Sequence, residues 1–232
     1  MKKNLIILFG ALAAASPVLA GEWERVGTDD GITVERRRVD GSNLLEFRGR
    51  GVVDAPIAAL LATFLDVEHA TEWMDQCNGS SIVEDAGERH KIVYNRTHAP
   101  WPVADRDAVL DNVLSFDERE RRVRLEFSSV THPRKGAVDG VVRMPFLRGH
   151  WYLWPEAGGR KTRVEYQVHA DPGGLLPAFL VNYASKDLPK KTIAGLRAQL
   201  KRRSYPQVEK WIRAFPEYRF IDAEGMISAR PL

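Results

Sequence analysis

The sequence predicts one α+β domain in which a curved antiparallel sheet is closed by a long amphipathic helix. Apolar and polar residues alternate with period two in residues 31–53 and again, repeatedly, in 79–170. Within 79–170 the strands follow one another with no helix between them, so they are expected to pair as an antiparallel meander. After the Asp-Pro-Gly-Gly segment 171–174 the apolar period becomes helical. With 44% hydrophobic and 28% charged residues, the composition excludes disordered, collagen-like and coiled-coil chains.

The first twenty residues have the pattern of an export signal. Two lysines precede an uninterrupted run of apolar and small residues, 5–15, and residues 18–20 (Val-Leu-Ala) suit a cleavage site. The apolar run is too short to span a bilayer comfortably, which needs about 20 residues. We therefore expect residues 1–20 to be removed and the protein to be exported to a periplasm, with secretion or an uncleaved anchor as alternatives.

The mature domain is expected to begin with a hairpin and two short helices. The half-buried strands 31–39 and 44–53 flank a polar turn, Asp-Gly-Ser-Asn. Asp54 is a candidate cap for a helix whose first turn contains Pro56 and whose apolar residues recur at helical spacing. A second short helix is expected near 68–74.

Four later runs alternate clearly and predict four strands of the meander. They lie around 91–95, 109–114, 122–128 and 164–168. The single cysteine, Cys77, is expected to be a small, partly buried core residue rather than a reactive thiol.

An apolar stripe from Phe179 to Leu200 predicts the closing helix, with lysines and arginines on its other side. Pro189 should kink or restart this helix, and Asp187 could cap its second half. The tail, 205–232, alternates aromatic residues with charges and breakers, and is expected to pack on the outside of the domain. Docking of a partner by this tail is the alternative.

Charge and residue spacing argue against two classes of function. The chain has 34 Lys plus Arg and 31 Asp plus Glu. Without the two lysines of residues 1–20 the count is 32 against 31, or +1, which is unlike a surface that binds nucleic acid. The six histidines form neither an H-x-x-x-H nor an H-E-x-x-H pattern, and one cysteine cannot build a metal site. No metal and no nucleic acid are therefore expected.

Three ordered motifs resemble the START domains, the steroidogenic-acute-regulatory-related lipid-transfer family. The first is Tyr94-Asn-Arg-Thr-His-Ala-Pro-Trp-Pro-Val-Ala-Asp-Arg-Asp107, in which a Pro-Trp-Pro loop joins two strands. The second is Gly149-His-Trp-Tyr-Leu-Trp-Pro155, followed by 162–166 and 171–177. The third runs from Val181-Asn182 through Pro189 to Leu196-Arg197. Together the matches are spread over about residues 22–203, so we place a START-like domain at 21–204.

The resemblance implies a helix-grip fold, in which the sheet wraps the last helix and leaves an apolar tunnel. It implies a monomer that uses no cofactor, binds one lipid or sterol-like molecule and carries it between membranes with transient membrane contact. An enzyme of the same fold, cyclase-like or hydrolase-like, acting on a small hydrophobic substrate, is the alternative. An apolar tunnel suits a lipid because it stays dry, and each methylene moved from water into the tunnel gains about 0.8 kcal/mol.

The candidate ligand-binding residues combine the apolar faces with the family motifs. They are Trp73, Tyr94, Trp101, Pro102, Arg106, Phe127, Tyr166, Phe179, Leu180 and Tyr183. No catalytic residue is assigned.

Two features of these candidates have alternative interpretations. Residues 98–104 are expected to form a lid with the final helix, and Trp101 either meets a membrane or packs on the domain. Arg106 either meets the polar head of a ligand or, as we favour, pairs with an acid on an adjacent strand, because a buried unpaired guanidinium would be prohibitive. Arg143 poses the same question.

Overall fold

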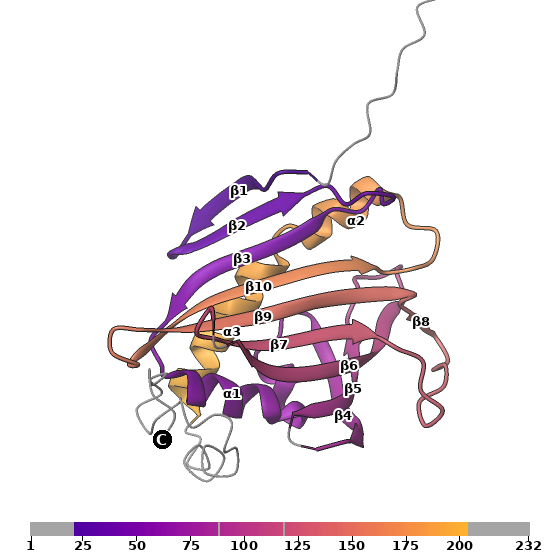
Figure 1. Cartoon of the computed structure of the whole chain (residues 1–232). Coiled ribbons are helices and arrows are strands. Elements are labelled where there is room, and N and C mark those ends of the chain that lie inside the picture. The colour runs from indigo at the N-terminus through magenta and orange to yellow at the C-terminus, as the bar shows by residue number, and fades with distance from the viewer. Residues whose placement is uncertain (1–20, 88, 118, 204–232) are drawn as a thin grey trace, which may run out of the picture.

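A long, curved antiparallel sheet forms most of the protein (Figure 1). The structure is a computed structural model that describes residues 21–87, 89–117 and 119–203. The strands of this part of the chain are β1 Glu24–Asp29, β2 Ile32–Arg37, β3 Glu46–Val53, β4 Cys77–Asp85, β5 His90–Thr97, β6 Asp105–Asp117, β7 Arg122–Ser129, β8 Val141–Arg143, β9 Phe146–Glu156 and β10 Lys161–Asp171. They lie in the order β1-β2-β3-β10-β9-β7-β6-β5-β4, and β8 pairs in parallel with the start of β6.

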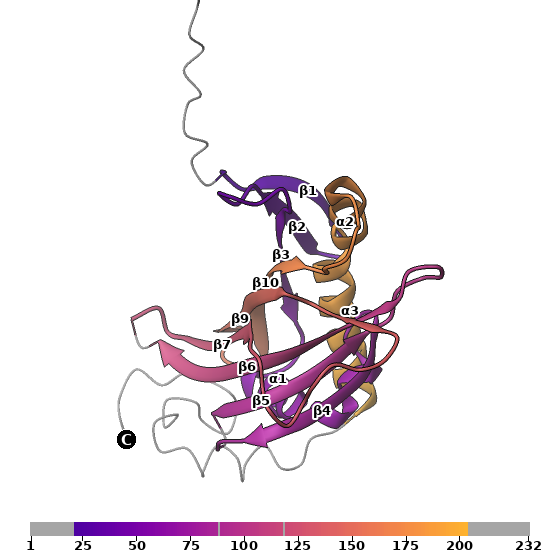
Figure 2. The same cartoon turned by 90° about the vertical axis from the view of Figure 1, so that its right-hand side faces the viewer.

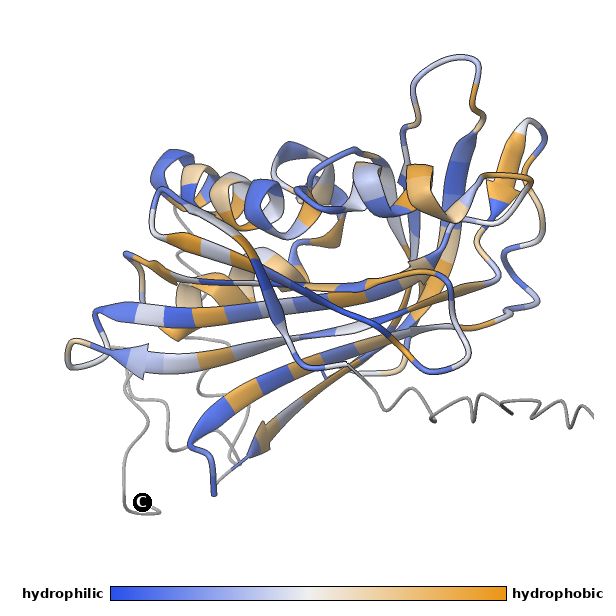
Figure 3. Cartoon of the chain, turned by 90° about the horizontal axis from the view of Figure 1, so that it is seen from above, coloured by the Kyte–Doolittle hydropathy of each residue, from blue (hydrophilic) through white to orange (hydrophobic). Residues whose placement is uncertain are grey.

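The helices lie on one side of this sheet (Figure 2). They are α1 Ile57–Leu65, the 3-10 helix η1 Val67–Glu72, α2 Ala178–Ser185 and α3 Leu188–Arg202. The strands carry alternating hydrophobic and hydrophilic bands because successive side chains point to opposite faces (Figure 3). The apolar face turned toward the helices forms one core with α1, η1 and α3. We call this face of the sheet the inner face.

Helix α3 packs tightly on the sheet and on η1. Ile193 and Leu196 are fully buried. A Cβ added at Gly49 of β3 would lie 2.9 Å from the Cβ of Pro189, and one at Gly195 would lie 2.0 Å from the carbonyl oxygen of Trp73. Only glycine allows these two approaches, so the sequence brings the helix into direct contact with its neighbours.

The α+β helix-grip prediction is confirmed: a curved sheet, open between its edge strands β1 and β4, carries a C-terminal helix. Strand β1 was not predicted because all six of its residues are exposed and show no alternation. The second short helix, expected near 68–74, is η1. The predicted export signal, 1–20, and the tail, 205–232, lie outside the described residues.

The expected long helix is two helices. Helix α2 ends at Ser185 and α3 restarts at Leu188 with Pro189 in its first turn, as Pro189 suggested. Both predicted side-chain caps are wrong. Asp187 precedes α3 but makes no side-chain cap bond, and Asp54 pairs with Lys161 at 2.7 Å instead of capping α1.

Candidate functional site

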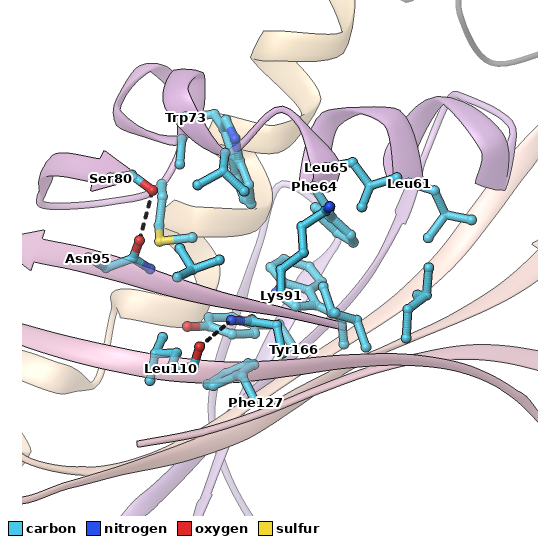
Figure 4. Close-up of a pocket in the computed structure, with 18 of the residues that line it drawn as sticks. Leu61, Phe64, Leu65, Trp73, Ser80, Lys91, Asn95, Leu110, Phe127 and Tyr166 are labelled. Atoms are coloured by element: carbon cyan, nitrogen blue, oxygen red, sulfur yellow. Dashed lines mark hydrogen bonds between the residues drawn. The ribbon is translucent and has the colours of Figure 1, made fainter. Parts of the chain in front are cut away.

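An apolar pocket lies between the α1–η1 segment and the inner face of the sheet (Figure 4). Its internal volume is about 110 Å³. The helical wall consists of Leu61, Phe64, Leu65, Val67, Ala70, Trp73 and Met74. The sheet wall consists of Ser80, Arg89, Lys91, Val93, Asn95, Leu110, Asn112, Leu114, Leu125, Phe127, Trp151 and Tyr166. Six consecutive strands of the sheet order, from β10 to β4, contribute to this wall.

Five aromatic rings pack around the middle of the pocket. Trp151 and Tyr166 stack with centroids 4.4 Å apart, and Phe64 lies 5.1 Å from Trp151 and 5.6 Å from Trp73. Phe127 is 6.3 Å from Tyr166. Burial raises the pKa of Tyr166 far above its usual range, so its hydroxyl stays neutral. These rings give the pocket a large, polarisable apolar surface with no titrating group at its centre.

The polar groups of the pocket sit on β4, β5 and β6 and, for Arg89, in the turn just before β5. Ser80 donates to the Asn95 carbonyl oxygen at 2.8 Å, and the Asn112 amide donates to the Leu110 carbonyl at 3.0 Å. Lys91 lies opposite Asn112 in the β5–β6 register, and its stem runs along the pocket near Phe64 (Figure 4).

Three of the ten predicted residues line this pocket: Trp73, Phe127 and Tyr166. Trp73 closes it from the end of η1, while Phe127 and Tyr166 stand on β7 and β10. The structure places the other seven elsewhere.

Tyr94 points to the outer face and does not line this pocket. Its neighbours Val93 and Asn95 line the pocket, and alternation turns Tyr94 the other way. There the Lys135 amine lies 3.8 Å from the ring centroid, and burial together with the Asp107 carboxylate raises the pKa of the phenol. The alternation of apolar residues suggested that Tyr94 faces the core. The segment after β7 covers this part of the outer face, so both faces of β5 are buried and alternation does not distinguish them.

Arg106 lies on the inner face beyond the end of the pocket and is 7% exposed. Its guanidinium donates to three backbone carbonyls, those of Ala104, Pro172 and Gly173. It therefore ties the end of the loop after β5 to the turn that precedes α2. The favoured prediction, an ion pair between Arg106 and an acid on an adjacent strand, is wrong, because the Arg106 guanidinium donates its hydrogen bonds to backbone carbonyl oxygens instead.

The predicted type of ion pair occurs at Arg143 instead. Its guanidinium binds both oxygens of Asp107, at 2.6 and 3.2 Å, and the Asp107 side chain is only 1% exposed. This contact raises the pKa of Arg143. The pair joins β8 to β6 on the outer face, so its role is structural.

The remaining five candidates face solvent rather than the pocket. Trp101 is 92% exposed, Phe179 76% and Tyr183 67%, while Leu180 and Pro102 are also exposed. Residues of α2 miss the pocket because this helix is separate from α3, and Asn182 fixes it to the segment before β3 through the Leu45 N–H at 2.8 Å. The stripe of α3 misses it because that helix packs directly on the sheet.

The loop that carries Trp101 is held at its base by Asp105. This carboxylate accepts hydrogen bonds from Asn78 at 3.0 Å, from the Ala99 N–H at 3.1 Å and from Arg96 at 2.8 Å. Those bonds, with that of Asn78 the largest cause, hold the pKa of Asp105 well below its usual range. The exposed tip of the loop, with Trp101, is therefore held in place by the hydrogen bonds of Asp105 at the loop base.

Sequence reasoning missed the helical wall apart from Trp73, and it missed Trp151 and the polar lining. Leu61 and Phe64 were expected only as core residues of a helix. Lys91 and Asn95 were read as the solvent side of their strand, because a pocket face that carries polar residues has the same alternation as an exposed face.

Within the described residues, no group of three or more His, Cys, Asp or Glu side chains could hold a metal ion. No helix in this part of the chain has the length and apolar character needed to cross a membrane. Cys77 is partly buried, as expected, and burial raises the pKa of its thiol.

Comparison with known proteins gives consistent matches over this fold. The model of the START domain family matches residues 19–203. A crystal structure of a STAR-related lipid transfer protein from Xanthomonas axonopodis is 30% identical, covers 77% of this chain and 98% of its own, and superposes with a TM-score of 0.71.

Two curated proteins extend the comparison. An uncharacterised Pseudomonas aeruginosa protein, PA1579, is 29% identical over 85% of this chain and 96% of its own length. The mouse phosphatidylcholine transfer protein is 27% identical over 74% of this chain and 80% of its own length.

Proposed function

The chain belongs to the START domain family, and on that basis we propose that it binds one lipid in the pocket and carries it, unaltered, between membranes. The observation that carries the proposal is the aromatic-lined pocket on the inner face of the sheet. The Xanthomonas axonopodis and mouse relatives are lipid transfer proteins by name, which agrees with it. The family, rather than any one residue, supports carriage instead of catalysis.

Loading requires the pocket to widen. Its volume of about 110 Å³ is below the roughly 150 Å³ of an engineered apolar cavity that accepts benzene, so the closed pocket holds a short segment of chain at most. The wall formed by α1 and η1 is the element we propose to move, because it covers the pocket on the side opposite the sheet. Each methylene that enters gains about 0.8 kcal/mol relative to water, but little relative to a bilayer. Exchange is therefore favoured at a membrane.

We propose that a cluster of exposed apolar side chains makes this membrane contact. The cluster, which we call the docking surface, consists of Trp101, Leu175, Phe179, Leu180 and Tyr183. It joins the loop after β5, the turn before α2 and α2 itself.

Arg106 holds this surface together, because its guanidinium bonds carbonyls on both of the first two segments. The Lys186 amine lies 4.1 Å from the Tyr183 ring centroid, so the surface combines interfacial aromatics with a cation. In this arrangement residues 98–104 dock the protein, and the protein works as a monomer in an exported compartment.

The test is to purify the full chain from its host, extract it with organic solvent and identify bound molecules by mass spectrometry. One unaltered lipid per protein supports the carrier. A chemically converted product released on adding a lipid would instead establish an enzyme of this fold, and a protein that neither retains nor takes up any lipid would refute the proposal.

A further inference from the structure

The charged groups that line the pocket are both cationic. Among the described residues that form its walls, Lys91 and Arg89 carry charge, and no carboxylate does. Among all the described residues that line the pocket, Arg89 is the one that is exposed, so it marks where the pocket meets solvent. The rest of the lining is apolar apart from three neutral polar residues on β4, β5 and β6.

The geometry of Lys91 is that of a charge held at the edge of an apolar space. Its side chain is only 13% exposed, and its amine reaches Asp85 of β4 at 2.7 Å. Asp85 is itself 56% exposed, so water screens this pair and the pair contributes little. The amine can therefore bind a second anion without losing a strong interaction.

A neutral donor lies opposite Lys91 on the neighbouring strand β6. Asn112 faces Lys91 directly across the β5–β6 pairing, where opposite side chains stand about 5 Å apart. Its amide now bonds the Leu110 carbonyl and retains a second N–H. A carboxylate or phosphate between Lys91 and Asn112 would thus receive a charge-assisted bond and a neutral one.

We propose that the ligand is a single-chain amphiphile with an anionic head. The head is held by Lys91, Asn112 and Arg89, and the tail of the ligand runs along the inner face toward Trp73 and Tyr166. This inference rests on the proposed lipid binding and specifies its ligand class. The narrow pocket suits one acyl chain better than two. Its head meets water at Arg89, and the charged side chains in the lining are cations; Asp85, the partner of Lys91, is an exposed residue outside the lining.

Three probes with one chain and different heads test the inference. They are a dansyl-labelled undecanoate, its methyl ester and the matching trimethylammonium compound. Binding is followed by energy transfer from the tryptophans of the chain, of which Trp73 and Trp151 line the pocket. We expect the carboxylate to bind about tenfold more tightly than the ester, as for a hydrogen bond to a charged group. The trimethylammonium probe should bind most weakly.

Variants of Lys91 assign the effect to this site. Lys91→Met keeps the apolar stem and should reduce the preference severalfold, whereas Lys91→Arg should retain it. Lys161→Met is the matched control, because Lys161 makes a similar surface pair with Asp54 and does not line the pocket. Circular dichroism and the unfolding midpoint of each variant separate loss of binding from loss of fold.

The outcomes separate the two proposals. Equal affinities for the three probes would overturn the anionic head and leave lipid binding intact. A preference for the carboxylate that is unchanged by Lys91→Met would overturn the assignment to this site. Failure of all three probes to bind would overturn lipid binding in this pocket, and this inference with it.

Discussion

Replacing Trp101 with alanine should weaken membrane contact strongly and leave the fold unchanged. The side chain is 92% exposed, so its loss should change the free energy of unfolding by less than about 0.5 kcal/mol. A tryptophan offers about 200 Å² of surface, and half of that buried in a bilayer at about 25 cal/mol per Å² contributes about 2.5 kcal/mol. Binding to vesicles should therefore fall about seventyfold.

Vesicle co-sedimentation gives the affinity, and transfer of a fluorescent lipid between donor and acceptor vesicles gives the rate. Ile82→Ala is the matched control, because Ile82 is an exposed apolar residue, 41% accessible, on the edge strand β4 and outside the docking surface. If Trp101→Ala and Ile82→Ala bind and transfer equally well, the docking surface does not contact the membrane and the reasoning is refuted.

Three further changes test the packing and the charges described above. Gly195→Ala places a Cβ against the Trp73 carbonyl oxygen and should lower the free energy of unfolding in urea by about 3 kcal/mol; an unchanged midpoint would contradict the close contact of α3 with η1. Asp107→Ala leaves the Arg143 guanidinium without its carboxylate and should lower the free energy of unfolding by about 3 kcal/mol in the same assay. Adding Arg143→Met to this variant should restore part of the lost stability. Strictly additive losses of stability would argue against the pair. Because the pKa of Asp105 is depressed in the fold, its contribution is complete above the unfolded-state pKa of about 3.9 and is lost as the pH falls toward the folded-state pKa. The advantage of the wild type over Asp105→Asn should be constant between about pH 7 and about pH 5 and should begin to shrink as the pH falls below about 4 in urea titrations; a difference that stays constant down to about pH 2 would contradict the assignment.

The sequence predicted the class of fold well because the strands of the meander alternate and their turns are polar. It could not tell the inner face from the outer face of β5. There Val93 lines the pocket and Tyr94 is buried on the other side, so alternation marks two buried faces rather than one. The covering segment that buries Tyr94 has no periodic pattern of its own.

The position of the closing helix was also beyond sequence reasoning. Residues 179–200 show one continuous apolar stripe, but the break after Ser185 turns Phe179 and Tyr183 to solvent while Ile193 stays buried. Whether such a helix leaves space beneath it depends on contacts such as that between Gly49 and Pro189, which distant segments make together. The period of the hydrophobic residues carries no information on the distance between the helix and the sheet.

The pairing of β3 with β10 has a consequence for how the chain reaches its fold. Gln167 bonds Glu46 at 2.7 Å across this pair, although 121 positions separate them in sequence. The three N-terminal strands thus have no place in the sheet until the last strand has been synthesised. Closing so large a loop is entropically expensive before the contacts reward it, which predicts slow folding with high contact order. A nascent chain that lacks β10 would keep its early strands unpaired with the rest and open to any factor that binds unfolded polypeptide.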